Sequence, residues 1–401
     1  MLKALSTTLK YFLIAFVAVL VAVYISACSS FGKLPDLSDD KVTEKFERSP
    51  QWDGQYFKNT LAQEPVDRWK AARAFFLASN PNTEPDPALE VDATDANIYA
   101  QAPASGLRVT WLGHSILLLE IDDKRILIDP VWSERASPFS FMGAKRFYPS
   151  PLAFEDLPDI DAVLISHDHY DHLDMETVKR LKEQDLNWYV PLGVGSHLRY
   201  WGVNEDKIYE MDWWQQQTLG DVTISSIPSR HSSGRTLSGR EHKKTLWSGW
   251  AINGPEHSVV YSGDTSMHPD FAEVGKRLGP FDLSIIEIGA YNPLWRDNHL
   301  GPEQAFIAHQ LLQAKAMLPV HWAGFNLSRH AWTAPIERLL MAADESNSDS
   351  RIIIPKPGQA FEPSQPPENQ RWWPSIPWDG VETEPVWSSK VDDLLEAYRK
   401  R

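Results

Sequence analysis

Ala162-Val163-Leu164-Ile165-Ser166 runs directly into His167-Asp168-His169-Tyr170-Asp171-His172, the most informative stretch of the chain. Its apolar half predicts a short buried strand. Its polar half offers four potential metal ligands within six residues. Alternation lets His167 and His169 share one side of an extended segment, and Asp171 and His172 then turn toward a second position. A single ion would not use all four ligands, so the stretch indicates a pair of metal ions.

Three further polar side chains follow other apolar runs. Ile227-Pro228-Ser229-Arg230-His231, Val260-Tyr261-Ser262-Gly263-Asp264 and Pro319-Val320-His321 each end on a ligand type. With the first four residues they make seven nitrogen and oxygen donors and no sulfur, a set that suits Zn²⁺, with Mn²⁺ or Fe²⁺ as alternatives. Two such ions about 3.5–4 Å apart activate water at neutral pH and clamp both oxygens of a displacement.

The composition of the 401 residues narrows the class of protein. Hydrophobic residues make up 42% of the chain, enough for a large core, which excludes a disordered polymer. The 39 basic and 54 acidic residues give a net charge of −15, which argues against nucleic acid as a partner. The single cysteine rules out an intramolecular disulfide and a cysteine-rich zinc site.

Short β-rich runs alternate with turn signals and a smaller number of helical stretches. Pro302 to Ala314 is one predicted helix, since Pro302 suits its first turn and apolar residues recur at helical spacing. About ten strands with fewer helices predict a layered α/β or α+β architecture.

The chain divides into five predicted parts. We expect a signal peptide at 1–27, a polar tether at 28–54, a helical extension at 55–105 around Trp69, a catalytic domain at 106–361, and a Trp/Pro-rich C-terminal strap at 362–401. The strap should be ordered, because its indole side chains would be costly to expose.

The N-terminus has the pattern of a secretory signal. Lys3 and Lys10 precede an uncharged, mostly apolar run that ends at Ala27. Ile25-Ser26-Ala27-Cys28 resembles the bacterial lipobox, in which the cysteine is lipidated and becomes the first mature residue. By resemblance to lipoprotein sorting, Ser29 indicates the outer membrane of a bacterial envelope, with a periplasmic catalytic domain. An uncleaved membrane anchor is the alternative.

The motifs together resemble a known family. The HxHxDH signature of the metallo-β-lactamase fold stands complete at His167 to His172. A closer resemblance, over about residues 108 to 326, is to the N-acyl-phosphatidylethanolamine-hydrolysing phospholipase D branch. The strings that carry it include Trp111-Leu112-Gly113-His114-Ser115, Met142-Gly143-Ala144-Lys145-Arg146-Phe147, Leu246-Trp247-Ser248-Gly249-Trp250 and His321-Trp322-Ala323-Gly324.

The resemblance implies a four-layer αββα sandwich with two zinc ions at one edge. By the family's pattern, His167, His169 and His231 hold one ion, Asp171, His172 and His321 hold the other, and Asp264 bridges. The implied reaction cleaves an N-acylated phosphatidylethanolamine on the phosphatidyl side. The implied partners are therefore a phospholipid or other small-molecule substrate and a membrane reached through the lipid anchor. A homodimer is one arrangement that the resemblance leaves open.

Two further residues are candidates for catalysis. His299 precedes the Pro302 helix, whose N-terminal amides favour an anion, so it either faces a phosphate or caps the helix. Asp129 ends the strand Ile126-Leu127-Ile128 and is expected to orient a metal-bound histidine, a turn residue being the alternative. His114 is predicted either in a turn or at the rim of the site. Lys145 and Arg146 either attract a phosphate or form a solvated surface.

Two alternatives to a phosphodiesterase remain open at the level of sequence. The same two-metal chemistry opens lactones and cleaves other esters or amides, and such substrates need no long apolar groove. The chain could also be a non-catalytic outer-membrane envelope lipoprotein on a hydrolase fold, although a complete ligand set argues against that.

Overall fold

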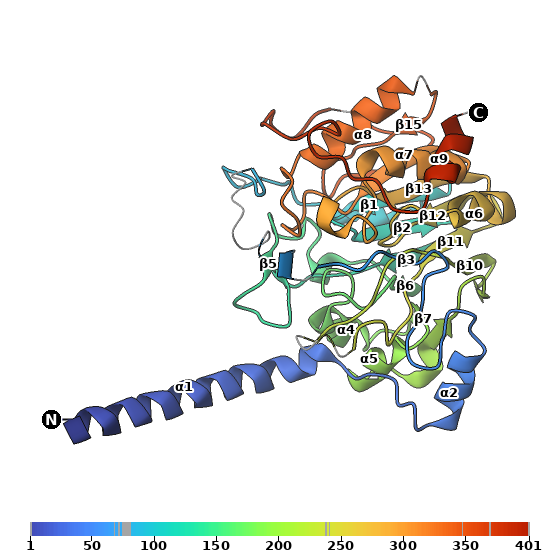
Figure 1. Cartoon of the computed structure of the whole chain (residues 1–401). Helices are drawn as coiled ribbons and strands as arrows, with labels where there is room; N and C mark the ends of the chain where they lie inside the picture. The colour runs from blue at the N-terminus through green and yellow to red at the C-terminus, as the bar shows by residue number, and fades with distance from the viewer. Residues whose placement is uncertain are drawn as a thin grey trace.

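The computed structural model describes residues 2–67, 69–70, 73, 82–236, 239, 241–346, 348–368 and 370–399. Two large sheets pack face to face, and helices cover both outer faces (Figure 1). The α+β sandwich expected from the sequence is therefore confirmed.

The first sheet has seven strands in the order β16-β1-β2-β3-β6-β7-β8. Its members are β1 (Leu107–Trp111), β2 (Leu117–Ile121), β3 (Lys124–Ile128), β6 (Ala162–Leu164), β7 (Asn187–Pro191), β8 (Ile208–Met211) and β16 (Ala360–Phe361). From β3 to β8 the neighbours are parallel, so the chain leaves β3 and β6 at the same edge. A separate ribbon pairs β4 (Arg135–Ala136) with β5 (Ala144–Lys145).

The second sheet also has seven strands, in the order β15-β14-β13-β12-β11-β10-β9. Its members are β9 (Gln216–Leu219), β10 (Val222–Ile227), β11 (Gly249–Asn253), β12 (Ser258–Tyr261), β13 (Phe281–Glu287), β14 (Ala314–Val320) and β15 (Arg351–Ile352). Strands β12 to β15 are parallel. The residues that follow β12, β13 and β14 are thus delivered to one edge.

Helices form the two outer layers. The α-helices of the body are α4 (Met175–Leu181), α5 (Gly195–Tyr200), α6 (Asp270–Leu278), α7 (Pro302–Leu311), α8 (Ala334–Glu345) and α9 (Asp392–Arg399). Short 3₁₀ turns lie at η1 (Ala96–Ala100), η2 (Phe154–Asp156), η3 (Glu205–Lys207) and η4 (Pro293–Trp295). Apolar side chains of α4 and α5 pack on the first sheet, and those of α6, α7 and α8 join the core of the second.

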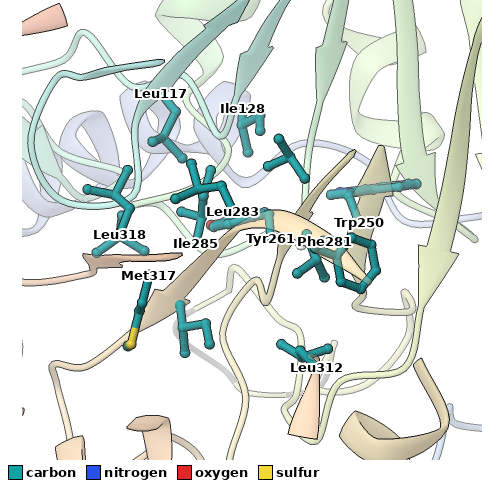
Figure 2. Packing of buried hydrophobic residues seen from close by; sticks show 14 of the residues in the cluster. Leu117, Ile128, Trp250, Tyr261, Phe281, Leu283, Ile285, Leu312, Met317 and Leu318 are labelled. Carbon is teal, nitrogen blue, oxygen red and sulfur yellow. The ribbon is translucent and has the colours of Figure 1, made fainter. Parts of the chain in front are cut away.

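The main core lies between the sheets and continues under the helices of the second. Leu117 and Ile128 of the first sheet lie over Ile285 and Leu318 of the second in Figure 2, and all four are fully buried. This dry interior holds the strand ends rigidly, which is what a multi-residue site at the sheet edge requires.

The N-terminus forms one long helix. Helix α1 (Leu2–Phe31) projects from the body (Figure 1). Phe12, Ile14 and Phe16 on this helix are exposed. Its last turn touches the body, where Ala27 and Phe31 are buried beside Phe139. A search of the described residues finds no helix with the length and apolarity needed to cross a membrane.

Residues 28–54 differ from the expected tether, because they pack on the body. Helix α2 (Asp40–Glu47) buries Phe46, which contacts the rings of Trp52 and Phe57 at centroid distances of 5.1 and 4.9 Å. This small cluster joins the buried Trp247. The segment looks polar in sequence because only a few aromatic residues anchor it.

The other two extensions also contact the body. The helix expected around Trp69 falls mostly outside the described residues, and the rest of 55–105 is irregular apart from η1. In the strap, Trp373 and Val386 are buried against the body, and Val391 and Leu395 at α9 join the main core.

Candidate metal centre

The edge where β6, β10, β12 and β14 end gathers the seven predicted ligands. His167, His169, Asp171 and His172 lie in the loop after β6, His231 follows β10, Asp264 follows β12, and His321 follows β14. Potential ligand atoms lie within 4.8 Å of one another in three clusters: His167, His169, His231 and Asp264; His114, Asp171, His172 and His321; and Asp264, Glu287, His299 and His321. Residues up to 154 positions apart in sequence thus meet because parallel strands end together.

The first ligand group consists of His167, His169 and His231, with Asp264 beside them. His169 Nδ1 lies 2.8 Å from His167 Nε2 and 3.2 Å from His231 Nε2. Asp264 Oδ2 lies 3.7 Å from Nε2 of both His167 and His231. The three rings therefore converge on one point from three directions.

The second ligand group consists of Asp171, His172 and His321, again with Asp264. Asp171 Oδ2 lies 3.3 Å from His172 Nε2 and 3.4 Å from His321 Nε2. Asp264 presents Oδ2 to His172 Nε2 and Oδ1 to His321 Nε2, both at 3.2 Å. Asp264 is the carboxylate common to both groups, which is the position of a bridging ligand.

Both groups fit a divalent ion. Tetrahedral zinc with bonds of about 2.0–2.1 Å separates its ligand atoms by about 3.3–3.4 Å. The distances above, 2.8 to 3.7 Å, bracket this value. Within the described part of the chain, the buried atoms His172 Nε2, His321 Nε2 and Asp264 Oδ1 also lack a hydrogen-bond partner. Such atoms are costly unless something else coordinates them.

Asp129 anchors the second group from behind. It is fully buried, and its Oδ2 lies 2.7 Å from His172 Nδ1. The same carboxylate accepts hydrogen bonds from the backbone and hydroxyl of Ser166 and from Tyr261 Oη. A histidine whose Nδ1 donates to a carboxylate keeps Nε2 free for a metal. Asp129 thus lies beside His172, the kind of neighbour the sequence predicted for it, whereas nothing in the sequence indicated Ser166 and Tyr261.

Charge differs between the two groups. Burial lowers the pKa of His167 and of His231 well below the usual range, which keeps both rings neutral and able to coordinate. Burial acts the same way on His321, but Asp264 and Asp171 outweigh it and raise the pKa of His321 to about 10. The buried carboxylates of the second group thus stabilise positive charge, whether a proton or a cation supplies it.

Comparison with known proteins agrees with this geometry. Residues 124–322 match the family described as "Beta-lactamase superfamily domain". An uncharacterized protein of Mycobacterium tuberculosis is 45% identical over 291 residues, 72% of this chain and 77% of its own length. The N-acyl-phosphatidylethanolamine-hydrolyzing phospholipase D 1 of Caenorhabditis elegans is 37% identical over 275 residues, 65% of this chain and 77% of the relative.

The chain belongs to the metallo-β-lactamase superfamily. Within it, the chain falls in the branch of the N-acyl-phosphatidylethanolamine phospholipase D-like proteins, as its motifs predicted. Among solved structures, the isothiocyanate hydrolase from Delia radicum gut bacteria matches 64% of this chain and 98% of its own with a TM-score of 0.53 at 21% identity, which supports the fold. The protein is a metal-dependent hydrolase, and the non-catalytic alternative is set aside.

His299 stands next to both groups of this hydrolase. Its Nδ1 lies 2.7 Å from Glu287 Oε2 and 3.8 Å from Asp264 Oδ2. Its ring centroid is 5.1 Å from that of His231 and 5.2 Å from that of His321. The contact with Glu287, rather than helix capping, fixes the ring. Glu287 was missed in the sequence, although a carboxylate at the end of the apolar strand β13 is an unusual choice.

His114 lies in the turn between β1 and β2, as one of the two sequence alternatives held, and it also contacts the second group. It is buried, its Nε2 lies 3.0 Å from Asp171 Oδ2, and its ring centroid lies 4.2 Å from that of His321. Burial lowers the pKa of His114 to about 3, so a neutral ring contacts the Asp171 carboxylate. His114 therefore supports a ligand of the second group.

Two basic candidates lie away from the ligands. Lys145 is exposed and forms an ion pair of 2.8 Å with Glu134. Arg146 is buried, donates to the carbonyl oxygen of Val131 and lies over the ring of Phe325. Neither side chain contacts a ligand residue in these interactions, so the structure does not support a phosphate-attracting role for them.

Proposed function

We propose that this hydrolase is a two-zinc phosphodiesterase of the phospholipase D type that acts on N-acyl-phosphatidylethanolamine-like lipids. The observation that carries the proposal is the pair of ligand groups with Asp264 beside both, in a chain 37% identical to a relative named for that activity. Zinc is preferred because all donors are imidazole nitrogens and carboxylate oxygens, although Mn²⁺ or Fe²⁺ also suit such a set.

The residues divide the work by position. The first group would hold one ion, the second group the other, and Asp264 would contact both. Such a pair of ions lowers the pKa of water and stabilises charge on phosphoryl oxygens. Asp129 holds the His172 ring with its Nε2 directed to the site.

His299 is the proposed proton donor to the leaving oxygen. Its side chain is 13% exposed, so it remains accessible while Glu287 fixes its orientation through Nδ1. Replacement of His299 by Gln should lower turnover by about 10²-fold while the protein still binds two metal ions. Loss of a metal ion in this variant would instead make His299 part of the ligand set.

The substrate is tested by a panel of purified enzyme assays. Wild-type protein purified without chelator should contain two metal ions and release phosphatidic acid from N-acyl-phosphatidylethanolamine in mixed micelles. His169→Gln should abolish turnover, whereas the matched control His257→Gln, which alters a residue paired with Asp122, should not. Hydrolysis of lactones or thioesters without cleavage of any glycerophosphodiester would overturn the lipid assignment and leave the metal centre standing.

A lactone or other small ester is the second candidate substrate. The cavity that reaches His321 encloses about 20 Å³ and is lined by Phe147, Trp322 and Phe325 among others. That volume holds little more than one water molecule. A cavity of that size accommodates neither a lipid nor a lactone, so the lactone arm of the panel decides between the two substrates.

The lipid anchor is part of the same proposal. Acylation at Cys28 would place the body at the outer membrane with its catalytic domain in the periplasm, close to a bilayer substrate. The residues just after Cys28 contact the body, since Trp201 Nε1 donates to the carbonyl of Ser29 and Arg235 to that of Ser30. Mass spectrometry of the mature N-terminus tests the anchor: wild type should begin at an acylated Cys28, and Cys28→Ala should retain residues 1–27.

A further inference from the structure

His231 is held at its backbone by a residue from the N-terminal extension. Asn59 accepts a hydrogen bond from the His231 amide at 3.1 Å and donates to its carbonyl oxygen at 2.8 Å. The Asn59 side chain is itself fixed, because Trp247 Nε1 donates to it at 2.9 Å. This two-sided contact orients the peptide unit from which the ligand ring projects.

The neighbouring Arg230 ties the same turn to both ends of the chain. Its guanidinium is 1% exposed and donates to the carbonyl oxygens of Leu61 and Ala62 near the N-terminus. It also donates to the carbonyl and hydroxyl oxygens of Ser389 in the strap. A buried guanidinium with this many partners fixes the segments around it.

Asp297 completes the frame on the other side of His231. It pairs with Arg230 at 3.1 Å and is 3% exposed. It accepts hydrogen bonds from the Ser389 amide at 2.7 Å and the Ser389 hydroxyl at 2.6 Å. The next residue, Asn298, offers its carbonyl oxygen to His231 Nδ1 at 2.8 Å. A continuous chain of buried contacts thus runs from the strap to the ligand ring.

We propose that Asn59 and Ser389 are positioning residues that hold His231 in the geometry required by the first ligand group. Both lie outside residues 124–322, which match the superfamily, so the family core alone does not provide this support. Asn59 acts on the backbone of His231, and Ser389 acts through Asp297 and Asn298 on its Nδ1. The inference rests on the two-ion centre proposed above. It goes beyond that centre by stating that residues of both extensions support the binding of one of the two ions.

The alternative is that these contacts only stabilise the fold. Substitution of Ser388 distinguishes that alternative from the positioning role. Ser388 is the adjacent strap residue, it is also buried, and its hydroxyl contacts Gln304 Oε1 and the Met267 amide, both at 3.0 Å. Its hydroxyl makes no contact with Asp297. Ser388→Ala therefore removes the same group from the same strap without removing a hydrogen bond to Arg230 or Asp297, and Met267 connects it to Arg230 only through the Met267 backbone.

The experiment measures zinc binding to metal-free full-length protein by titration against a competing chelator. Wild type should bind two ions. Ser389→Ala and, independently, Asn59→Ala should each weaken one of the two binding events about 10-fold and leave the other unchanged. Ser388→Ala should lower the melting temperature of the metal-free protein about as much as Ser389→Ala while keeping both affinities.

A second measurement reports on the ring itself. In protein labelled with ¹⁵N-histidine and loaded with zinc, the hydrogen-bonded Nδ1 proton of His231 should give a slowly exchanging signal. Ser389→Ala should broaden that signal through faster exchange with solvent, and Ser388→Ala should not.

The outcomes are separable. Wild type that binds no zinc would overturn the proposed two-ion centre itself. Wild type that binds two ions, with unchanged affinities in both Ser389→Ala and Asn59→Ala, would overturn only the positioning role. Equal loss of affinity in Ser388→Ala would also overturn it, since the effect would then follow stability. If Ser389→Ala fails to fold, Asn59→Ala alone decides.

Discussion

The two ligand groups share Asp264 but are supported by different parts of the chain. In the second group, Asp129 orients His172. Asp129 accepts hydrogen bonds from Ser166 and Tyr261, which lie at the ends of two core strands. The first group depends on a frame of irregular segments in which Asn59 and Ser389 come from the two extensions. The comparison teaches that the second group is supported by core strands and by His114 in the turn after β1, whereas the first group recruits residues from both extensions.

The largest effect should come from the residue that belongs to both halves. Asp264→Ala removes the carboxylate common to the two groups, so we expect loss of both ions and a fall in activity of at least about 10³-fold. Metal analysis and turnover measure this directly. Loss of a single ion would show that Asp264 serves one group alone; Asp212→Asn, a buried aspartate elsewhere, is the control.

Loss of a buried ion pair remote from the centre tests whether a general loss of stability is enough to change zinc affinity. Arg108 and Glu120 are nearly as buried as Arg230 and Asp297, but they link β1 to β2 at the ends of these strands away from the ligands. Glu120→Gln removes the carboxylate charge that pairs with both Arg108 and Arg125 and should lower the free energy of unfolding by about 3 kcal/mol. Denaturant titration measures that loss, and zinc affinities that also changed would argue against a local frame.

Asp129→Asn should be the mirror image of Ser389→Ala. The amide cannot accept from Ser166, Tyr261 and His172 as the carboxylate does, so the His172 ring loses its orientation. We expect the affinity of one zinc ion to fall about 10- to 100-fold, with the other retained. In the double variant Asp129→Asn, Ser389→Ala, both binding events should be weak. If the two single variants weakened the same event, the proposed division of support would be incorrect.

The smallest expected effect is on pH-dependent stability and involves His309 in the outer helical layer, away from both ligand groups. His309 on α7 contacts Ser284 Oγ at 2.8 Å, and burial lowers the pKa of His309 to about 4. In the unfolded state the pKa of His309 is near 6.5, so between pH 6.5 and 4 the unfolded state binds a proton at His309 that the folded state does not. The free energy of unfolding therefore decreases as pH falls from about 6.5 toward 4. In the metal-free protein, His309→Gln should reduce the stability lost between pH 7 and 5 by about 1–2 kcal/mol. An identical pH profile would show that His309 is not kept neutral.

Much of the centre was predictable from sequence because its donors stand at strand ends. In the stretch from Ala162 to His172, and at His231, Asp264 and His321, an apolar run stops at a residue with a metal-binding side chain. Strand periodicity and residue type are local properties, so the ligand types and the layered fold could be read directly. Asp129 follows the same rule.

Other features depended on contacts between distant residues. Glu287 has no distinguishing mark in the sequence, and only the fold of β13 places it against His299. Likewise, only the fold brings Asn59 to the backbone of His231 and Ser389 to Asp297. Residues 28–54 resemble a tether in sequence, and only the fold packs Phe46 against other aromatic side chains.

Sequence by itself therefore determined a layered α/β or α+β architecture and the seven candidate ligands from local pattern and side-chain chemistry, and the family resemblance narrowed the architecture to a four-layer sandwich. The family resemblance implied which donors share a group and that Asp264 bridges, but only the tertiary structure decided the distances between them and which segments hold the rings in place. The physical reason is that a hydrogen bond or coordination geometry requires atoms about 3 Å apart, and separations in sequence carry no record of that distance.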